Sequence, residues 1–147
     1  MVNASFAGRT YPPMPPYEVG REKIREFAEV AGEHPFHVDP EAARAAGYAD
    51  VIAPPTFAVI ISMRCDAQLV TDPEAGIDYS RVVHGEQSFT HHRPIVAGDR
   101  LVAVLHVDNV RSAGGHAMVT TRSEISTEAG EPVCTATSTL VVRGEDA

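Results

Sequence analysis

Hydrophobic positions between Val19 and Gly32 recur at helical spacing. Side chains three and four residues apart share one face of a helix, so this pattern predicts a single amphipathic helix. Glycine is common just past the end of a helix, because it adopts a left-handed conformation without strain. Gly32 is therefore the expected end of this helix. The apolar positions that carry the pattern are Ile24, Phe27, Ala28 and Ala31.

Two further helices are predicted before residue 70. After a polar turn over residues 33–38, Asp39 is expected to cap a short helix that runs from Pro40 to Ala46. A longer helix is predicted from Pro55 to Leu69, and its first half is apolar on every side. A helix that is hydrophobic all round is typical of one buried on all sides, so this helix is the expected centre of the fold.

From about Tyr79 the hydrophobic period changes to two, which predicts β-strands. Turn signals at Gly114–Gly115 and Ala129–Glu131 separate segments rich in β-branched residues. Helices first and strands afterwards favour an α+β fold with an antiparallel meander, since a parallel sheet needs helices between its strands. The predicted strands are Val82–Arg93, Arg100–Val107, His116–Thr127 and Val133–Val142.

One buried helix and one antiparallel sheet predict a sheet wrapped around a long central helix, which is the shape of a hotdog domain. Such a sheet covers only one side of the helix, so the other side and the strand edges need further protein. We therefore expect at least a dimer. The chain has 147 residues, the size of one ordinary domain. Residues 1–147 are thus expected to form a single domain, with residues 1–16 as a Pro-rich N-terminal arm.

Composition and charge narrow the classes of function. The 12 Lys and Arg residues against 20 Asp and Glu residues give a net charge of -8, which opposes binding to nucleic acid or to an anionic membrane. Cys65 and Cys134 lack C-x-x-C spacing and are expected to be core residues in a reducing compartment. The longest apolar run, Phe57–Met63, is too short to span a bilayer, and no targeting segment is visible. A cytoplasmic location is therefore expected.

Several histidines and an arginine have both a functional and a plain structural interpretation. His91–His92 could suggest a metal, but strand neighbours point to opposite faces and no acid or thiol lies at ligand spacing, so no metal site is expected. Arg93 suits either a surface salt bridge or the phosphates of CoA or of a phosphopantetheine arm. His34 is expected to shape its turn beside Pro35.

Four motifs together resemble the MaoC-like, (R)-specific enoyl-thioester hydratases and dehydratases. The turn Ala31–Asp39 resembles their Gly-Asp-x-Asn-Pro-x-His signature, and the following short helix ends, as theirs do, in Gly47–Tyr48. Val51–Phe57 is similar to the start of the family's buried helix. Val83–Gln87 and Arg93–Leu101 resemble one subgroup, the FAS1-like dehydratase or MaoC N-terminal-like domain of actinobacterial two-subunit (3R)-hydroxyacyl-ACP dehydratases.

The signature turn departs from the family pattern in two ways. The family's turn is one residue longer and its acid is Asp, whereas Glu33 lies four positions before His37 here. The extra methylene of Glu33 could partly recover the lost reach. His34 stands at the family's Asn position. This subgroup often supplies the non-catalytic half of a heterodimer, so retention of His37 favours activity and loss of the Asp favours the non-catalytic alternative.

The resemblance implies a dehydratase or hydratase that interconverts (3R)-3-hydroxyacyl and trans-2-enoyl thioesters of CoA or acyl carrier protein, in fatty-acid or polyketide-type metabolism. It implies no cofactor and no metal. His37 and Glu33 would transfer protons, while backbone N–H groups near Thr56 and Phe57 would bind the enolate-like thioester oxygen. The alternative is a non-catalytic acyl-binding subunit of a heterodimer with a MaoC-like partner. A hotdog thioesterase would use a carboxylate near the buried helix, but nothing in the setting of Asp66 favours it.

Overall fold

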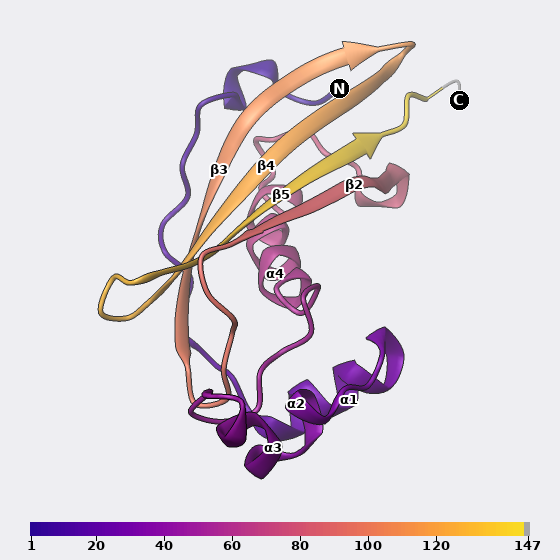
Figure 1. The fold of residues 1–147 in the computed structure, drawn as a ribbon. Helices are drawn as coiled ribbons and strands as arrows, with labels where there is room; N and C mark the ends of the chain where they lie inside the picture. Colours follow the sequence, from indigo (N-terminus) through magenta and orange to yellow (C-terminus); the bar gives the residue numbers. More distant parts are fainter. Residues whose placement is uncertain (146–147) are drawn as a thin grey trace.

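The second half of the chain forms the curled antiparallel sheet that its period-two pattern predicts (Figure 1). A computed structural model describes residues 1–145. Helix α4 (Val59–Val70) lies against one side of this sheet, and the smaller helices gather beyond one end of it. The α+β hotdog prediction is therefore confirmed. The strands are β1 (Tyr17–Glu18), β2 (Val82–His91), β3 (Arg100–Ala113), β4 (His116–Thr127) and β5 (Pro132–Val142), in the spatial order β1-β3-β4-β5-β2.

Three of the strands form the predicted meander. Strands β3, β4 and β5 follow one another, and Gly114 and Gly115 take φ values of 59° and 83° in the first turn, as a tight hairpin requires. Strand β2 instead pairs with β5 over its whole length and forms an edge. The prediction of a four-stranded meander is wrong for β2, because the connection over residues 92–99 takes the chain toward the other edge before β3 begins.

The N-terminal arm lies along β3 and covers that edge of the sheet. After a 3-10 turn, η1 (Ala4–Phe6), N–H groups of the arm donate to carbonyls of β3 at intervals: Gly8 to Val107 at 2.7 Å, Tyr11 to Leu105 at 2.9 Å and Met14 to Ala103 at 2.9 Å. The arm then continues into β1, which pairs with β3. In the described residues no strand pairs with the outer side of β2. One edge of the sheet is thus covered and the other is free.

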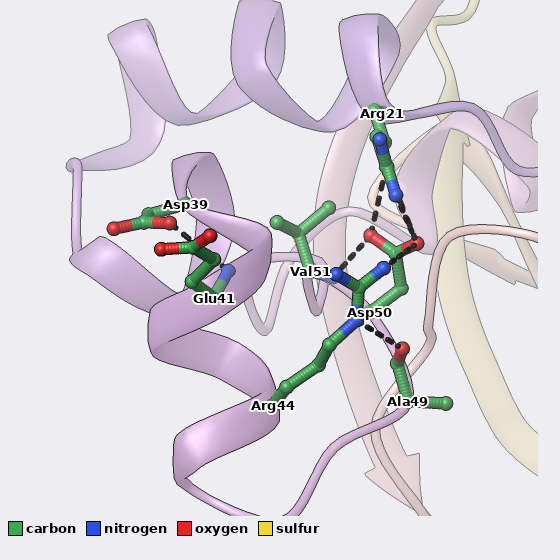
Figure 2. A network of polar contacts seen from close by, with 7 residues as sticks. All are labelled: Arg21, Asp39, Glu41, Arg44, Ala49, Asp50 and Val51. Carbon is green, nitrogen blue, oxygen red and sulfur yellow. Dashed lines mark hydrogen bonds and ion pairs between the residues drawn. The ribbon is translucent and has the colours of Figure 1, made fainter.

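The N-terminal helices follow the predicted caps. Helix α1 (Arg21–Ala31) ends at Gly32, and α3 (Pro40–Ala45) is capped by Asp39, whose carboxylate accepts the N–H of Glu41 at 3.0 Å (Figure 2). Between them lies one helical turn, α2 (Pro35–Val38), where the sequence predicts only a polar turn. Its N-cap is His34, which accepts a backbone N–H through its ring. An imidazole is an unusual cap, and sequence pattern alone did not reveal it.

Helix α4 begins later than predicted. Proline lacks an N–H and disfavours a helical conformation in the residue before it, so the two residues Pro54–Pro55 delay the helix. Tight turns over residues 55–58 precede it, with the N–H of Phe57 bonded to the carbonyl of Pro54 at 3.0 Å. The predicted start at Pro55 is therefore four residues too early.

One side of α4 is buried against the sheet and the other is open. Ile61, Cys65 and Leu69 are almost fully buried, whereas Met63 is 57% exposed and Arg64 is exposed as well. The prediction of a helix buried on every side is thus wrong for a single chain, because one curled sheet covers only one side. Cys65 and Cys134 are free and buried, as predicted. Among the described residues, no helix has the length and hydropathy needed to cross a membrane.

Asp66 is a carboxyl buried between α4 and the sheet. It is 6% exposed, and its Oδ1 accepts the hydroxyl of Thr121 at 2.6 Å. Burial raises the pKa of Asp66, and hydrogen bonds from Thr121 and Ser138 offset this only in part. A buried carboxyl with a raised pKa favours the folded state only while it is neutral. Its contribution to stability is fully present below the pKa of an unfolded Asp, about 3.9, and is lost as the pH rises through the pKa of Asp66 in the folded protein. Asp66 should therefore reduce stability at neutral pH.

Replacing Asp66 by Asn keeps the oxygen that accepts from Thr121 and removes the charge. We expect Asp66→Asn to raise the free energy of unfolding at pH 7 by about 1 kcal/mol, with a gain that shrinks as the pH falls toward 4. Urea unfolding at fixed protein concentration measures this. Asp78→Asn is the matched control, since hydrogen bonds from Ser80 lower the pKa of exposed Asp78. A variant at Asp66 that is no more stable than wild type at pH 7 would contradict the prediction.

The free edge of β2 and the open side of α4 predict that the protein is at least a dimer in solution. We expect Met63→Glu to shift the sedimentation coefficient at micromolar concentration toward that of the monomer, because it places a charge on the open side of α4. Val30→Glu is the control, since Val30 is 92% exposed on α1. A wild-type protein that sediments as a stable monomer would show the prediction to be wrong.

Candidate active site

A pocket of about 560 Å³ lies where α2, the segment before α4 and the end of β2 meet. Its walls come from three stretches of chain, within residues 34–37, 52–55 and 91–95. Apolar side chains and prolines alternate there with four histidines and one arginine, and no carboxylate is among the lining residues of the described chain. A largely apolar cavity with a few polar groups is the usual form of a small-molecule site.

His37 lines this pocket from α2 and is half-buried. Its Nδ1 lies 2.7 Å from the carbonyl oxygen of Ile52, which can only accept, so Nδ1 must carry a hydrogen. The other ring nitrogen, Nε2, is then the proton acceptor of the neutral imidazole. A second bond joins the same two segments, since the N–H of Ile52 donates to the carbonyl of Phe36 at 2.9 Å. The ring is thus held in one tautomer and one orientation.

Asp50 fastens the segment that leads to this carbonyl, and it does so from two helices (Figure 2). Arg21, at the start of α1, donates Nε and Nη2 to the carboxylate at 3.0 and 2.7 Å, and the N–H of Val51 donates to it at 2.7 Å. Arg44, near the end of α3, lies 3.7 Å away. The hydrogen bond from Arg21 is the main reason that the pKa of Asp50 is lowered. Asp50 therefore ties α1 and α3 to the pocket wall.

The remaining histidines of the pocket differ in what their rings do. His34 is occupied by capping, because its Nδ1 accepts the N–H of Phe36 at 3.3 Å, which agrees with its predicted role in shaping the turn. His91 ends β2 with its Nε2 2.7 Å from the carbonyl of Pro55. His92 has Nε2 3.5 Å from the hydroxyl of Thr135. No three His, Cys, Asp or Glu side chains are grouped to hold a metal ion in residues 1–145.

Glu33, the predicted acid partner of His37, is not among the residues that line the pocket. It is exposed in the turn that follows α1, where it adds a small contribution to the raised pKa of Arg25, an effect that comes mainly from Glu22. The structure therefore does not bring Glu33 and His37 together in one cavity.

Thr56 and Phe57, the predicted binders of the thioester oxygen, adjoin the pocket wall without lining it. The N–H of Phe57 already donates to the carbonyl of Pro54, and its ring is buried against that of Phe27, with 5.5 Å between ring centroids. Thr56 is exposed. The proposed role of these backbone groups stays a prediction. Thr56 is the better placed of the two, because the N–H of Phe57 is already bonded to Pro54.

Arg93 lines the pocket, but its guanidinium is held by other residues. It forms a two-pronged ion pair with Asp99, at 2.9 and 3.0 Å, and donates also to Glu131 and to the carbonyl of Pro94. The hydrogen bonds from Arg93 to Asp99 are the main reason that the pKa of Arg93 is raised. Of the two roles predicted for Arg93, the structure shows the salt bridge. Binding of a phosphate stays a prediction and would have to compete with two carboxylates.

Sequence patterns did not identify His91 or Asp50 as parts of this site. Their only signal is position, since His91 precedes the Arg93–Pro94 pair and Asp50 precedes the Val51–Phe57 motif. Both act through contacts between segments far apart in the chain. Such contacts depend on the folded arrangement and leave no periodic trace in the sequence.

Comparison with known proteins relates the chain to one family. Residues 5–136 match the family described as "FAS1-like, dehydratase domain region". A protein of Saccharopolyspora erythraea called UPF0336 protein is 63% identical over 144 residues, which cover 97% of this chain and 92% of that protein.

Two solved structures share the fold closely. One, called MaoC-like dehydratase, is 35% identical with a TM-score of 0.87 over 97% of this chain, which spans only 43% of that longer protein. The other is a C-terminally truncated HadBC (3R-hydroxyacyl-ACP dehydratase) complex from Mycobacterium tuberculosis. It is 33% identical with a TM-score of 0.82, and the match covers 92% of this chain and 96% of that one.

The network around Asp50 yields a test of how the pocket wall is held. Asp50→Ala leaves Arg21 and the N–H of Val51 without their partner, so we expect the free energy of unfolding at pH 7 to fall by about 1–2 kcal/mol. Because the pKa of Asp50 is lowered on folding, its contribution is present above the unfolded pKa and lost as the pH falls through the folded value. The difference in free energy of unfolding between Asp50→Ala and wild type should therefore become smaller toward pH 4.

Urea unfolding at the two pH values measures the effect. Arg44→Met serves as the comparison, since Arg44 is half-exposed and comes no nearer to Asp50 than 3.7 Å. This variant should lower the free energy of unfolding by less than about 0.5 kcal/mol. Equal losses for the two variants would contradict the assignment of Asp50 as the fastening residue.

Proposed function

The chain belongs to the FAS1-like dehydratase-domain family, and on that premise we propose that it catalyses the reversible hydration of trans-2-enoyl thioesters to (3R)-3-hydroxyacyl thioesters. The acyl group would be carried by CoA or by an acyl carrier protein. The HadBC complex is called a (3R)-hydroxyacyl-ACP dehydratase, and the similarity of this chain to one of its chains supports this substrate class.

The observation that carries the proposal is the held imidazole of His37. Hydration requires a base that takes a proton from water, and dehydration requires an acid that gives one to the leaving hydroxyl. A neutral imidazole with Nδ1–H bonded to a carbonyl presents Nε2 for both transfers. His37 lies where a small molecule would fit.

The shape and lining of the pocket suit an acyl thioester. Its volume of about 560 Å³ is within the range of small-molecule sites, and its apolar walls favour an acyl chain over a charged metabolite. Nothing among the lining side chains carries a negative charge that would repel an enolate-like oxygen. No cofactor is needed for this chemistry.

A second candidate function is that of a non-catalytic acyl-binding subunit. The absence of a carboxylate among the described lining residues favours it, because the related signature pairs the histidine with an acid. In that case the chain would form a heterodimer with a second MaoC-like chain that supplies the complete pair. The similarity to a chain of the two-protein HadBC complex supports such an assembly.

Hydration of crotonyl-CoA by the purified chain, alone and with a second MaoC-like chain from the same organism, tests both functions. For the catalytic function we expect His37→Ala to lower kcat about 10²–10⁴-fold, with a melting temperature close to that of wild type. Glu33→Gln should retain most activity, since Glu33 lies outside the pocket. His106→Ala is a control for loss of an imidazole elsewhere, on β3.

The outcomes separate the two candidates. Activity that requires the second chain, and that survives His37→Ala, would assign the chain as an acyl-binding subunit. Absence of activity in every combination would overturn the proposed reaction. A large loss in Glu33→Gln would return Glu33 to the acid role that the sequence predicts.

A further inference from the structure

We propose that His91 is a second catalytic residue, which exchanges a proton with the α-carbon of the substrate while His37 exchanges one with water. This inference rests on the proposed hydration reaction. Addition of water across a double bond moves two protons at two different atoms, and the pocket must supply a group for each. Since no carboxylate lines the described pocket, the second group has to be found among its other side chains.

His91 is held by the same kind of contact as His37. Its Nε2 lies 2.7 Å from the carbonyl oxygen of Pro55, which can only accept, so Nε2 carries a hydrogen and Nδ1 is the exchangeable position. The ring also stacks on that of Phe89, with centroids 6.1 Å apart and planes 24° apart. A carbonyl and an aromatic ring thus fix the orientation of an exposed imidazole that lines the pocket from β2.

The two imidazoles are anchored on one short and stiff stretch of chain. Their carbonyl partners, Ile52 and Pro55, are three residues apart, and the prolines of this stretch have fixed φ angles. The N–H of Ala53 is bonded to the carbonyl of Ile95 at 2.8 Å, which ties the stretch to the third wall of the pocket. The orientation of each ring relative to this stretch is therefore set before substrate binds, as proton transfer to fixed atoms requires.

The other polar residues of the pocket are less suited to this role. His34 uses Nδ1 to cap α2, and His92 is 3.5 Å from a hydroxyl without a carbonyl to fix its tautomer. Arg93 is paired with carboxylates, and a guanidinium does not release its proton in a protein. Apart from His37, His91 is the one lining residue with one ring nitrogen bonded to a carbonyl and the other without a partner in residues 1–145.

The proton balance of the proposed step is complete. In hydration, Nε2 of His37 takes a proton from water as the oxygen bonds to C3 of the enoyl thioester. The π electrons of the C2–C3 bond move toward the thioester carbonyl, and protonated His91 gives its Nδ1 proton to C2. His37 ends protonated and His91 neutral, and exchange with solvent restores both. Dehydration follows the same path in reverse, with His91 taking the C2 proton.

Substitution of His91 tests the inference in the crotonyl-CoA assay. We expect His91→Gln to lower kcat at least 100-fold while KM changes less than about threefold, because the variant removes proton transfer but keeps a side chain of similar size. His106→Gln is the matched control and should behave as wild type. Circular dichroism confirms that each variant is folded.

A measurement without turnover accompanies the assay. With ¹⁵N-labelled histidine, addition of the unreactive thioester butyryl-CoA should shift the ring resonances of His37 and His91 and leave those of His106 unchanged. If His37→Ala abolishes hydration and His91→Gln does not, the role of His91 is overturned while the proposed function stands. If butyryl-CoA leaves the His91 resonances unchanged, His91 does not contact the substrate and the inference is wrong. If the wild-type chain hydrates nothing in any combination, the proposed function fails first.

Discussion

A curled sheet can bury only one side of a helix, and much of the chain is arranged around that limit. The sheet-facing side chains of α4 fill the concave face, whereas its opposite side carries the exposed Met63. The remaining helices lie beyond one end of the sheet and do not pack as a second layer over α4, so α4 stays half enclosed (Figure 1). The pocket forms there, between those helices and the strand that ends at His91.

The stretch from Asp50 to Pro55 connects the N-terminal helices to the pocket. At its start, Asp50 accepts hydrogen bonds from Arg21 of α1 and lies near Arg44 of α3. Further along, the carbonyls of Ile52 and Pro55 orient the imidazoles of His37 and His91. Polar backbone groups that would otherwise need water are thus paired with ring nitrogens. The same hydrogen bonds that satisfy the backbone also set the tautomers of His37 and His91.

Periodicity predicted the elements well, because burial on one face leaves a repeating trace in the sequence. Helices α1 and α3 and strand β4 lie close to their expected bounds, and the arm is extended as its prolines indicate. The neighbour of β2 could not be predicted, since a period of two identifies a strand but not its partner. The turn motif singled out His37, which the structure places in the pocket lining, and its catalytic role stays a prediction. The position of Glu33 outside the pocket follows from the shortened turn and the extra helical turn α2, which only the folded chain reveals.

The Pro-rich arm limits how many molecules can pair their sheets edge to edge. It occupies the β3 edge with a strip of chain in which four of the six residues from Tyr11 to Pro16 are prolines, which have no N–H to offer another strand. Within residues 1–145 the sheet is left with a single open edge, on β2, and so with a valence of one. Two open edges would permit end-to-end polymerisation into fibres, whereas a valence of one makes any edge-to-edge growth stop after a single addition.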